Sequence, residues 1–90
     1  MTKSNTPPTL GGLAEQYYHH QGVPVPGADD LSLDTARAAS QLTFAADRIA
    51  VRRAVGLTML YLAAYAARIG TDPAACMMEI IEEAAAYAQA

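Results

Sequence analysis

The longest helical pattern in the chain covers residues 33–69, which contain no proline and have Gly56 as their single weak point. In the first half of this segment, polar and apolar residues separate on a helical wheel drawn at about 100° per residue. The stripe predicted to face water holds Asp34, Arg37, Gln41, Arg48 and Arg52, and the stripe predicted to be buried holds Ala39, Leu42, Ala46, Ile49 and Ala50.

The second half of the segment is different, because past Val55 the polar stripe has no successor until Arg68. A helix that is apolar around its whole circumference must be covered on several sides. One continuous helix over residues 33–69 would be about 55 Å long, roughly twice the width of a compact domain of this size. We therefore expect either a break near Gly56 that folds the chain back, or an elongated homo-oligomer that buries this surface.

A short helix is predicted over residues 10–20, since Leu13 and Tyr17 lie one turn apart and Gly22 can end the helix. Residues 23–27 alternate valine with proline and should run extended. A cluster of capping side chains then marks the start of the long helical segment. This cluster consists of Asp29, Asp30, Ser32 and Asp34.

The last helix has the clearest boundary in the chain, because Gly70 fits a C-terminal cap and Asp72-Pro73 fits a helix start. It is predicted to run from Pro73 to about Gln89, with an apolar face and an acidic face. The apolar face holds Ala74, Met77, Met78, Ile81, Ala84, Ala85 and Ala88, and the acidic face holds Glu79, Glu82 and Glu83.

Composition favours helix throughout, because twenty of the 90 residues are alanine and β-branched residues are sparse. The predicted fold class is all-α, a small helical bundle of three to four helices that forms an oligomer. Residues 1–9, which are polar and contain Pro7 and Pro8, are predicted to be a flexible arm, and residues 10–90 a single helical domain.

Charge and cysteine content argue against several classes of function. The net charge of −3 gives no general attraction to nucleic acid. The longest uncharged run, residues 54–67, is 14 residues long, shorter than the roughly 20 that a membrane-spanning helix needs. Cys76 is the single cysteine and cannot form a disulfide framework. We expect no direct nucleic-acid binding, no membrane association and a cytoplasmic location.

Tyr17, Tyr18 and His20 form an aromatic and imidazole cluster in the first helix, together with His19. Adjacent histidines on a helix point about 100° apart and cannot readily hold one metal ion. Either one tyrosine packs on the core and the histidines face solvent, or the tyrosines form a partner-binding patch. Phe44 is the next candidate anchor.

Arg53 lies among apolar side chains on the wheel, where an unpaired guanidinium would be costly to bury. We expect either a helix end near Gly56 that exposes it, or an ion pair with a glutamate of the last helix. The candidate partner-binding residues are Tyr17, Tyr18, His20, Phe44, Arg48, Arg52, Arg53, Glu79, Glu82 and Glu83.

No nucleophile, base and orienting group can be assembled into a catalytic set, and no cofactor or metal site is predicted. The Glu-x-x-Glu-Glu order of the last helix differs from the Glu-Glu-x-x-Glu of all-α nucleotide pyrophosphohydrolases, and a second acidic helix is missing. The leading hypothesis is a non-enzymatic, homo-oligomeric interaction module that binds a larger macromolecule, with a protein as the expected partner, as inhibitor, adaptor or assembly factor. The alternatives are an acidic decoy that inhibits a nucleic-acid-binding complex, and a small ligand-binding or hydrolytic module.

Overall fold

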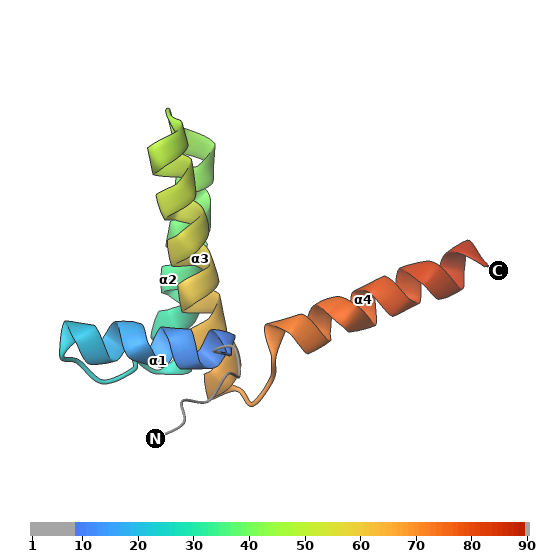
Figure 1. The fold of residues 1–90 in the computed structure, drawn as a ribbon, viewed down its shortest axis with the longest axis horizontal. Helices are drawn as coiled ribbons and strands as arrows, with labels where there is room; N and C mark the ends of the chain where they lie inside the picture. Colours follow the sequence, from blue (N-terminus) through green and yellow to red (C-terminus); the bar gives the residue numbers. More distant parts are fainter. Residues whose placement is uncertain (1–8, 90) are drawn as a thin grey trace, which may run out of the picture.

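The computed structural model describes residues 9–89, and this part of the chain forms four helices and no strand (Figure 1). These are α1 (Leu10–Gln21), α2 (Ala28–Phe44), α3 (Arg48–Arg68) and α4 (Pro73–Ala88). The all-α prediction is confirmed. Most of the arm predicted over residues 1–9 lies outside the described residues. Thr9 is described and caps α1, because its hydroxyl accepts a hydrogen bond from the Gly12 amide at 2.9 Å.

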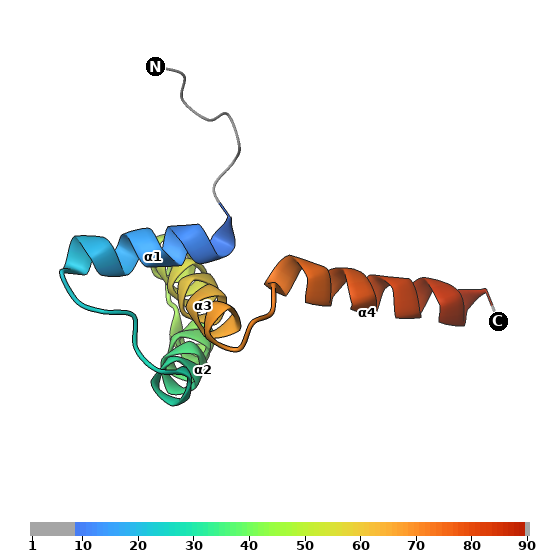
Figure 2. The same cartoon turned by 90° about the horizontal axis from the view of Figure 1, so that it is seen from below.

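Helices α2 and α3 lie side by side as an antiparallel hairpin, and α1 crosses the end of this hairpin where α2 begins and α3 ends (Figures 1 and 2). We refer to α1, α2 and α3 together as the body. The fourth helix leaves the end of α3 and runs away from the body in both views. The radius of gyration is 15.8 Å, where a compact domain of 90 residues has about 12 Å.

The core lies where α1 meets the hairpin. Leu31 of α2 is completely buried, and Tyr18 of α1 is 5% exposed. The other buried members are alanines, Ala14 of α1 with Ala63 and Ala64 of α3. Small side chains at the contact allow the helix axes to approach closely. The core is therefore built largely from alanine, with Leu31 as its largest fully buried side chain.

The break in the long helical segment lies at residues 45–47 and not near Gly56. The Asp47 carboxylate accepts a hydrogen bond from the Ala50 amide at 2.8 Å and begins α3 as its N-cap. Because the turn comes at this point, α2 and α3 become two neighbours of similar length that cover each other. Gly56 lies inside α3, and a Cβ there would meet no atom within 4 Å.

This position of the break overturns most of the predicted buried stripe. The stripe assumed one continuous wheel, but the turn resets the phase between α2 and α3. Ile49 is 81% exposed and Leu42 is 42% exposed, and Ala46 is also exposed. Only Ala39 and Ala50 of that stripe are half-buried.

The remaining boundaries follow the sequence signals. Gly22 ends α1 with a φ of 70° and Gly70 follows α3 with a φ of 74°, a region that glycine enters without steric cost. Residues 23–27 run without helix, and Arg68 holds this linker by donating hydrogen bonds to the Val25 and Pro26 carbonyl oxygens. Helix α2 begins five residues before Leu33, with Asp29 and Asp30 in its first turn. Helix α4 begins at Pro73 after the Asp72 cap, as predicted.

Helix α3 is long and apolar enough, by length and composition alone, to cross a membrane. Its best 18-residue window has a mean hydropathy of 1.2, and 22% of that window is buried within the structure. The prediction from the 14-residue uncharged run considered a shorter stretch than this helix. Much of the apolar surface of α3 is thus left open by the body.

Candidate functional site

The tyrosine cluster lies inside the body, where α1 packs on α3. Tyr18 is buried and Tyr17 is half-buried, with their ring centroids 5.0 Å apart in an edge-to-face arrangement. The Tyr18 hydroxyl is buried and has no hydrogen-bond partner among the described residues. Burial raises the pKa of Tyr18 to about 12, and the neighbouring Tyr61 and Asp34 add to the effect. Tyr18 is therefore a core residue and cannot serve as a surface anchor.

Tyr61 of α3 lies next to this cluster, and its pKa is also raised. Burial raises its pKa first, followed by the charge and hydrogen bonding of Tyr17 and the charge of Asp34, while Arg53 opposes the shift. Asp34 was predicted to face water, but it is half-buried and lies 4.0 Å from Arg37. Asp34 is therefore less accessible than the helical wheel predicted.

His20 lies exposed in the last turn of α1, where a cation would suit the negative end of the helix dipole. The His19 and His20 ring centroids are 6.0 Å apart. Within residues 9–89, no three histidine, cysteine or carboxylate side chains are grouped as metal ligands. His20 therefore stands apart from the other candidate residues.

Phe44 and Arg53 are brought together at the tip of the α2–α3 hairpin. Both line an open groove of about 340 Å³, whose apolar floor includes Ala54 and Leu57. Phe44 is 77% exposed, which is high for a phenylalanine, and Arg53 projects to solvent. Arg53 is exposed, but not at a helix end near Gly56 as predicted, because the break lies at residues 45–47 and Arg53 lies in the second turn of α3.

One side of α3 is apolar and uncovered. Val51, Val55, Met59 and Leu62 are 36–47% exposed, and their spacing of four, four and three residues places them in one stripe. We call these four residues the α3 stripe. Arg48 and Arg52 are exposed on the same side at its N-terminal end. Two predicted contact residues therefore border an apolar surface.

A groove between α1 and α3 adjoins this stripe. It has a volume of about 160 Å³, and every residue that lines it is apolar or glycine: Leu10, Leu13, Ala14, Gly56, Met59, Leu60 and Ala63. Met59 belongs to both the groove and the stripe, so the two form one continuous surface. The sequence pattern did not reveal this groove, because it depends on where α1 crosses α3.

Helix α4 has no buried residue among Pro73–Ala88, and only Pro73 and Cys76 in its first turn are half-buried. Its large apolar residues Met77, Met78, Ile80 and Ile81 are 59–65% exposed. Side chains of this size are normally buried in a folded domain, where each contributes about 1.5–3 kcal/mol. The apolar face predicted for this helix exists, but the chain itself does not cover it.

The charges of α3 and α4 are separated by sign. Helix α3 contains four arginines and no acid, whereas α4 contains three glutamates and no base. Among the described residues the one ion pair joins Arg37 to Asp34, so Glu79, Glu82 and Glu83 make no ion pair with the arginines. Two successive helices thus carry unmixed charge of opposite sign, and the chain does not bring them together.

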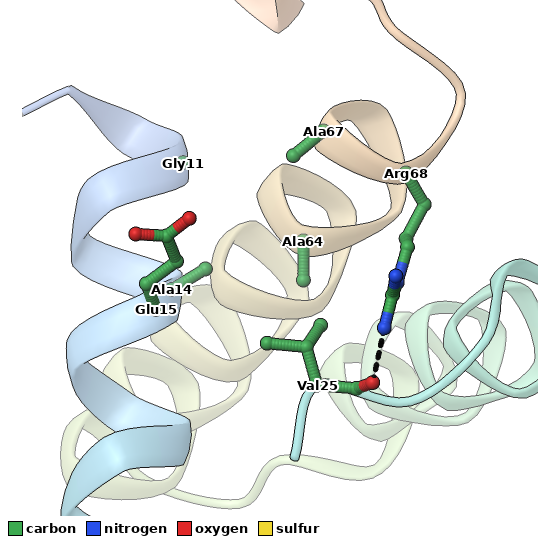
Figure 3. A pocket seen from close by; sticks show the side chains of 7 residues that line it. All are labelled: Gly11, Ala14, Glu15, Val25, Ala64, Ala67 and Arg68. Atoms are coloured by element: carbon green, nitrogen blue, oxygen red, sulfur yellow. Dashed lines mark hydrogen bonds between the residues drawn. The ribbon is translucent and has the colours of Figure 1, made fainter.

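A hollow of about 310 Å³ lies between α1, the linker and the end of α3 (Figure 3). Its walls are Gly11, Ala14, Val25, Ala64 and Ala67, with Glu15 and Arg68 as its charged residues. Arg68 already donates to the Val25 and Pro26 carbonyl oxygens, so its guanidinium is used to hold the linker. We assign this hollow to the packing of the linker.

Apart from His20, the structure therefore divides the predicted contact residues into three groups. Tyr17 and Tyr18 belong to the core region, Phe44 and the three arginines surround the hairpin tip, and the three glutamates lie on the isolated helix. Comparison with models of known protein families, with curated protein sequences and with solved structures finds no match to this chain.

Proposed function

We propose that this protein is a helical interaction module, and that α4 is the element through which it engages another protein chain. It acts by contact and not by catalysis, as an inhibitor, adaptor or assembly factor. The observation that supports the proposal is that α4 buries none of its sixteen residues although two isoleucines and two methionines lie on it. Exposed apolar patches of this kind mark interaction surfaces in soluble proteins.

Helix stability leads to the same conclusion. An isolated helix shorter than about 12–15 residues is marginal in water, and most helices in proteins depend on packing of an apolar face. At sixteen residues, α4 is slightly longer than this limit and has an Asp72 cap and Pro73 at its first turn, but it has no packed face. Docking on another chain would supply the burial that makes this helix stable.

Recognition of an amphipathic helix by an apolar groove uses side chains at i, i+3, i+4 and i+7. Met77, Ile80, Ile81 and Ala84 have this spacing. Methionine adapts its shape to irregular surfaces. The helix therefore has the composition of a segment that inserts into a groove, with the glutamates left at the rim.

The test removes the apolar face and keeps the helix. We expect Met77→Gln/Ile81→Gln to lose the proteins that the wild-type chain retains from cells of its host. The matched control, Ala75→Gln/Ala86→Gln, places the same side chain on the acidic side of α4 and should retain them. Amide exchange in the recovered complex should be slow along α4.

Retention of the same proteins by Met77→Gln/Ile81→Gln would contradict the proposal. Slow amide exchange of α4 in the isolated monomer would also contradict it, because the helix would then be packed within its own chain. Lipid vesicles provide a further comparison, since α3 has the length and hydropathy of a membrane segment. Binding to vesicles instead of proteins would replace the proposal with a membrane function.

A further inference from the structure

Two uncovered apolar surfaces of this chain match one another in length. The α3 stripe runs from Val51 to Leu62, about 16 Å along the helix, and continues into the groove beside Leu10 and Leu13. Helix α4 has sixteen residues and is about 24 Å long. A helix of this length would cover the stripe and the groove together.

The charges on the two helices that carry these surfaces are opposite in sign. Arg48, Arg52 and Arg53 are exposed around the N-terminal half of α3, and α3 has no acid to balance them. Glu79, Glu82 and Glu83 follow one side of α4, and α4 has no base. Opposite charges that border two apolar faces favour contact between those faces and select their register.

Within one chain, α4 cannot bring its glutamates opposite the arginines of α3, because the connection between the two helices is short. In an antiparallel fold-back, Glu82 would lie about 14 Å from the start of α4, whereas Arg52 lies about 24 Å from the end of α3. Because residues 69–72 fix the register, the two side chains would lie about 10 Å apart along the helix axis, which is nearly two turns. A second copy has no such restriction, and its α4 is free to slide into the matching register.

We propose that α4 of one copy docks on the α3 stripe and the adjoining groove of a second copy, and that the second copy reciprocates. The inference rests on the proposed role of α4 as docking element and identifies the chain on which α4 docks. The two contacts are equivalent under a two-fold axis, as in most homodimers. Residues 69–72, which join α3 to α4, are the hinge that lets the helix leave its own body.

The experiment uses two charge-reversed variants of the full chain and sedimentation velocity. The first variant is Glu82→Arg/Glu83→Arg, which gives α4 the same sign as α3. The second is Arg48→Glu/Arg52→Glu, which removes the net positive charge of α3 and places two glutamates beside the N-terminal end of the α3 stripe. All four side chains are exposed, so the body should fold in both variants.

We expect each variant alone to self-associate about tenfold more weakly than the wild type, or worse, because like charges meet in both contacts. Mixing the two variants should restore a heterodimer, since each α4 then meets an α3 of opposite charge. The matched control for the first variant is Asp29→Arg/Asp30→Arg, which makes the same change of charge at exposed positions on α2 and should leave self-association unchanged.

A dimer that is insensitive to these reversals, or a mixture that fails to restore association, would overturn the inference. A wild type that stays monomeric at every concentration would also overturn it. In that case amide exchange of α4 separates the two proposals. Fast exchange leaves α4 available for a different protein, so the proposed function stands, whereas slow exchange shows that α4 packs on its own body and both fail.

Discussion

The body and α4 differ in the opposite sense to their hydrophobicity. Helix α4 is the most apolar of the four helices, yet α1, α2 and α3 share a core whereas α4 has no buried residue. The difference lies in how the helices are connected. Helices α2 and α3 turn back on each other at residues 45–47, while the turn after Arg68 directs α4 away from the body (Figures 1 and 2). Apolar composition therefore predicts that a surface will be covered but not which chain covers it.

The largest expected effect contrasts one leucine of the body with one isoleucine of α4. Leu31→Ala should lower the free energy of unfolding by about 3 kcal/mol, because Leu31 is completely buried and its removal leaves a cavity. Ile81→Ala should change it by less than about 0.5 kcal/mol, because Ile81 is 61% exposed. Urea unfolding, followed by circular dichroism at a dilution where the protein is monomeric, measures both.

Equal losses of unfolding free energy from the two substitutions would contradict this prediction, because α4 would then belong to the cooperative core. A small loss from Leu31→Ala would place the centre of the core elsewhere. The association of the Ile81 variant should be measured alongside, since this substitution removes apolar surface from the docking face.

The sequence was informative where a boundary is set by local chemistry. Asp72, Pro73 and Gly70 predicted the start of α4 correctly, because a cap, a proline and a left-handed glycine act on their own neighbours. Asp47 has the same capping role at the start of α3, but the alanines before it continue the helical pattern. The capping signal was therefore outweighed by helix propensity, and the break was expected at Gly56.

Tertiary position could not be read from the same pattern. Asp34 looks like a surface residue on the wheel, but it is half-buried and lies near Tyr18 of α1 and Tyr61 of α3. The groove beside Leu13 and Gly56 exists because α1 crosses α3 at that point. Such features depend on how the helices are arranged in space, and a single wheel describes one helix at a time.

A smaller effect on stability is expected from two tyrosine substitutions, one at Tyr18, which is buried in the body, and one at Tyr87, which is exposed on α4. The folded state holds the Tyr18 proton more tightly than the unfolded state, since burial raises the pKa from 10.0 to about 12. This contribution to stability is present below pH 10 and is lost as the pH rises towards 12. Tyr18→Phe should reduce the alkaline loss of stability, although Tyr61, whose pKa is also raised, preserves part of it.

At neutral pH, Tyr18→Phe should be neutral or stabilising by up to about 1 kcal/mol, because the hydroxyl that it removes has no hydrogen-bond partner. The control is Tyr87→Phe in α4, where the side chain is 87% exposed and the substitution should alter neither value. Urea midpoints measured from neutral to alkaline pH give both results. A Tyr18→Phe variant with markedly lower stability at neutral pH would show that the hydroxyl is bonded.

The smallest expected effect compares helix propensity inside and outside the body. Gly56→Ala should raise the free energy of unfolding by about 0.5–1 kcal/mol, because alanine restricts the unfolded chain and its Cβ meets no atom within 4 Å. Ala84→Gly makes the reverse change in α4, where it should reduce the helical signal and leave the urea midpoint of the body unchanged. A midpoint that falls with Ala84→Gly would show that α4 and the body unfold together. If only the dimer becomes less stable, the coupling passes through the second copy, because the groove beside Gly56 is where its α4 would lie.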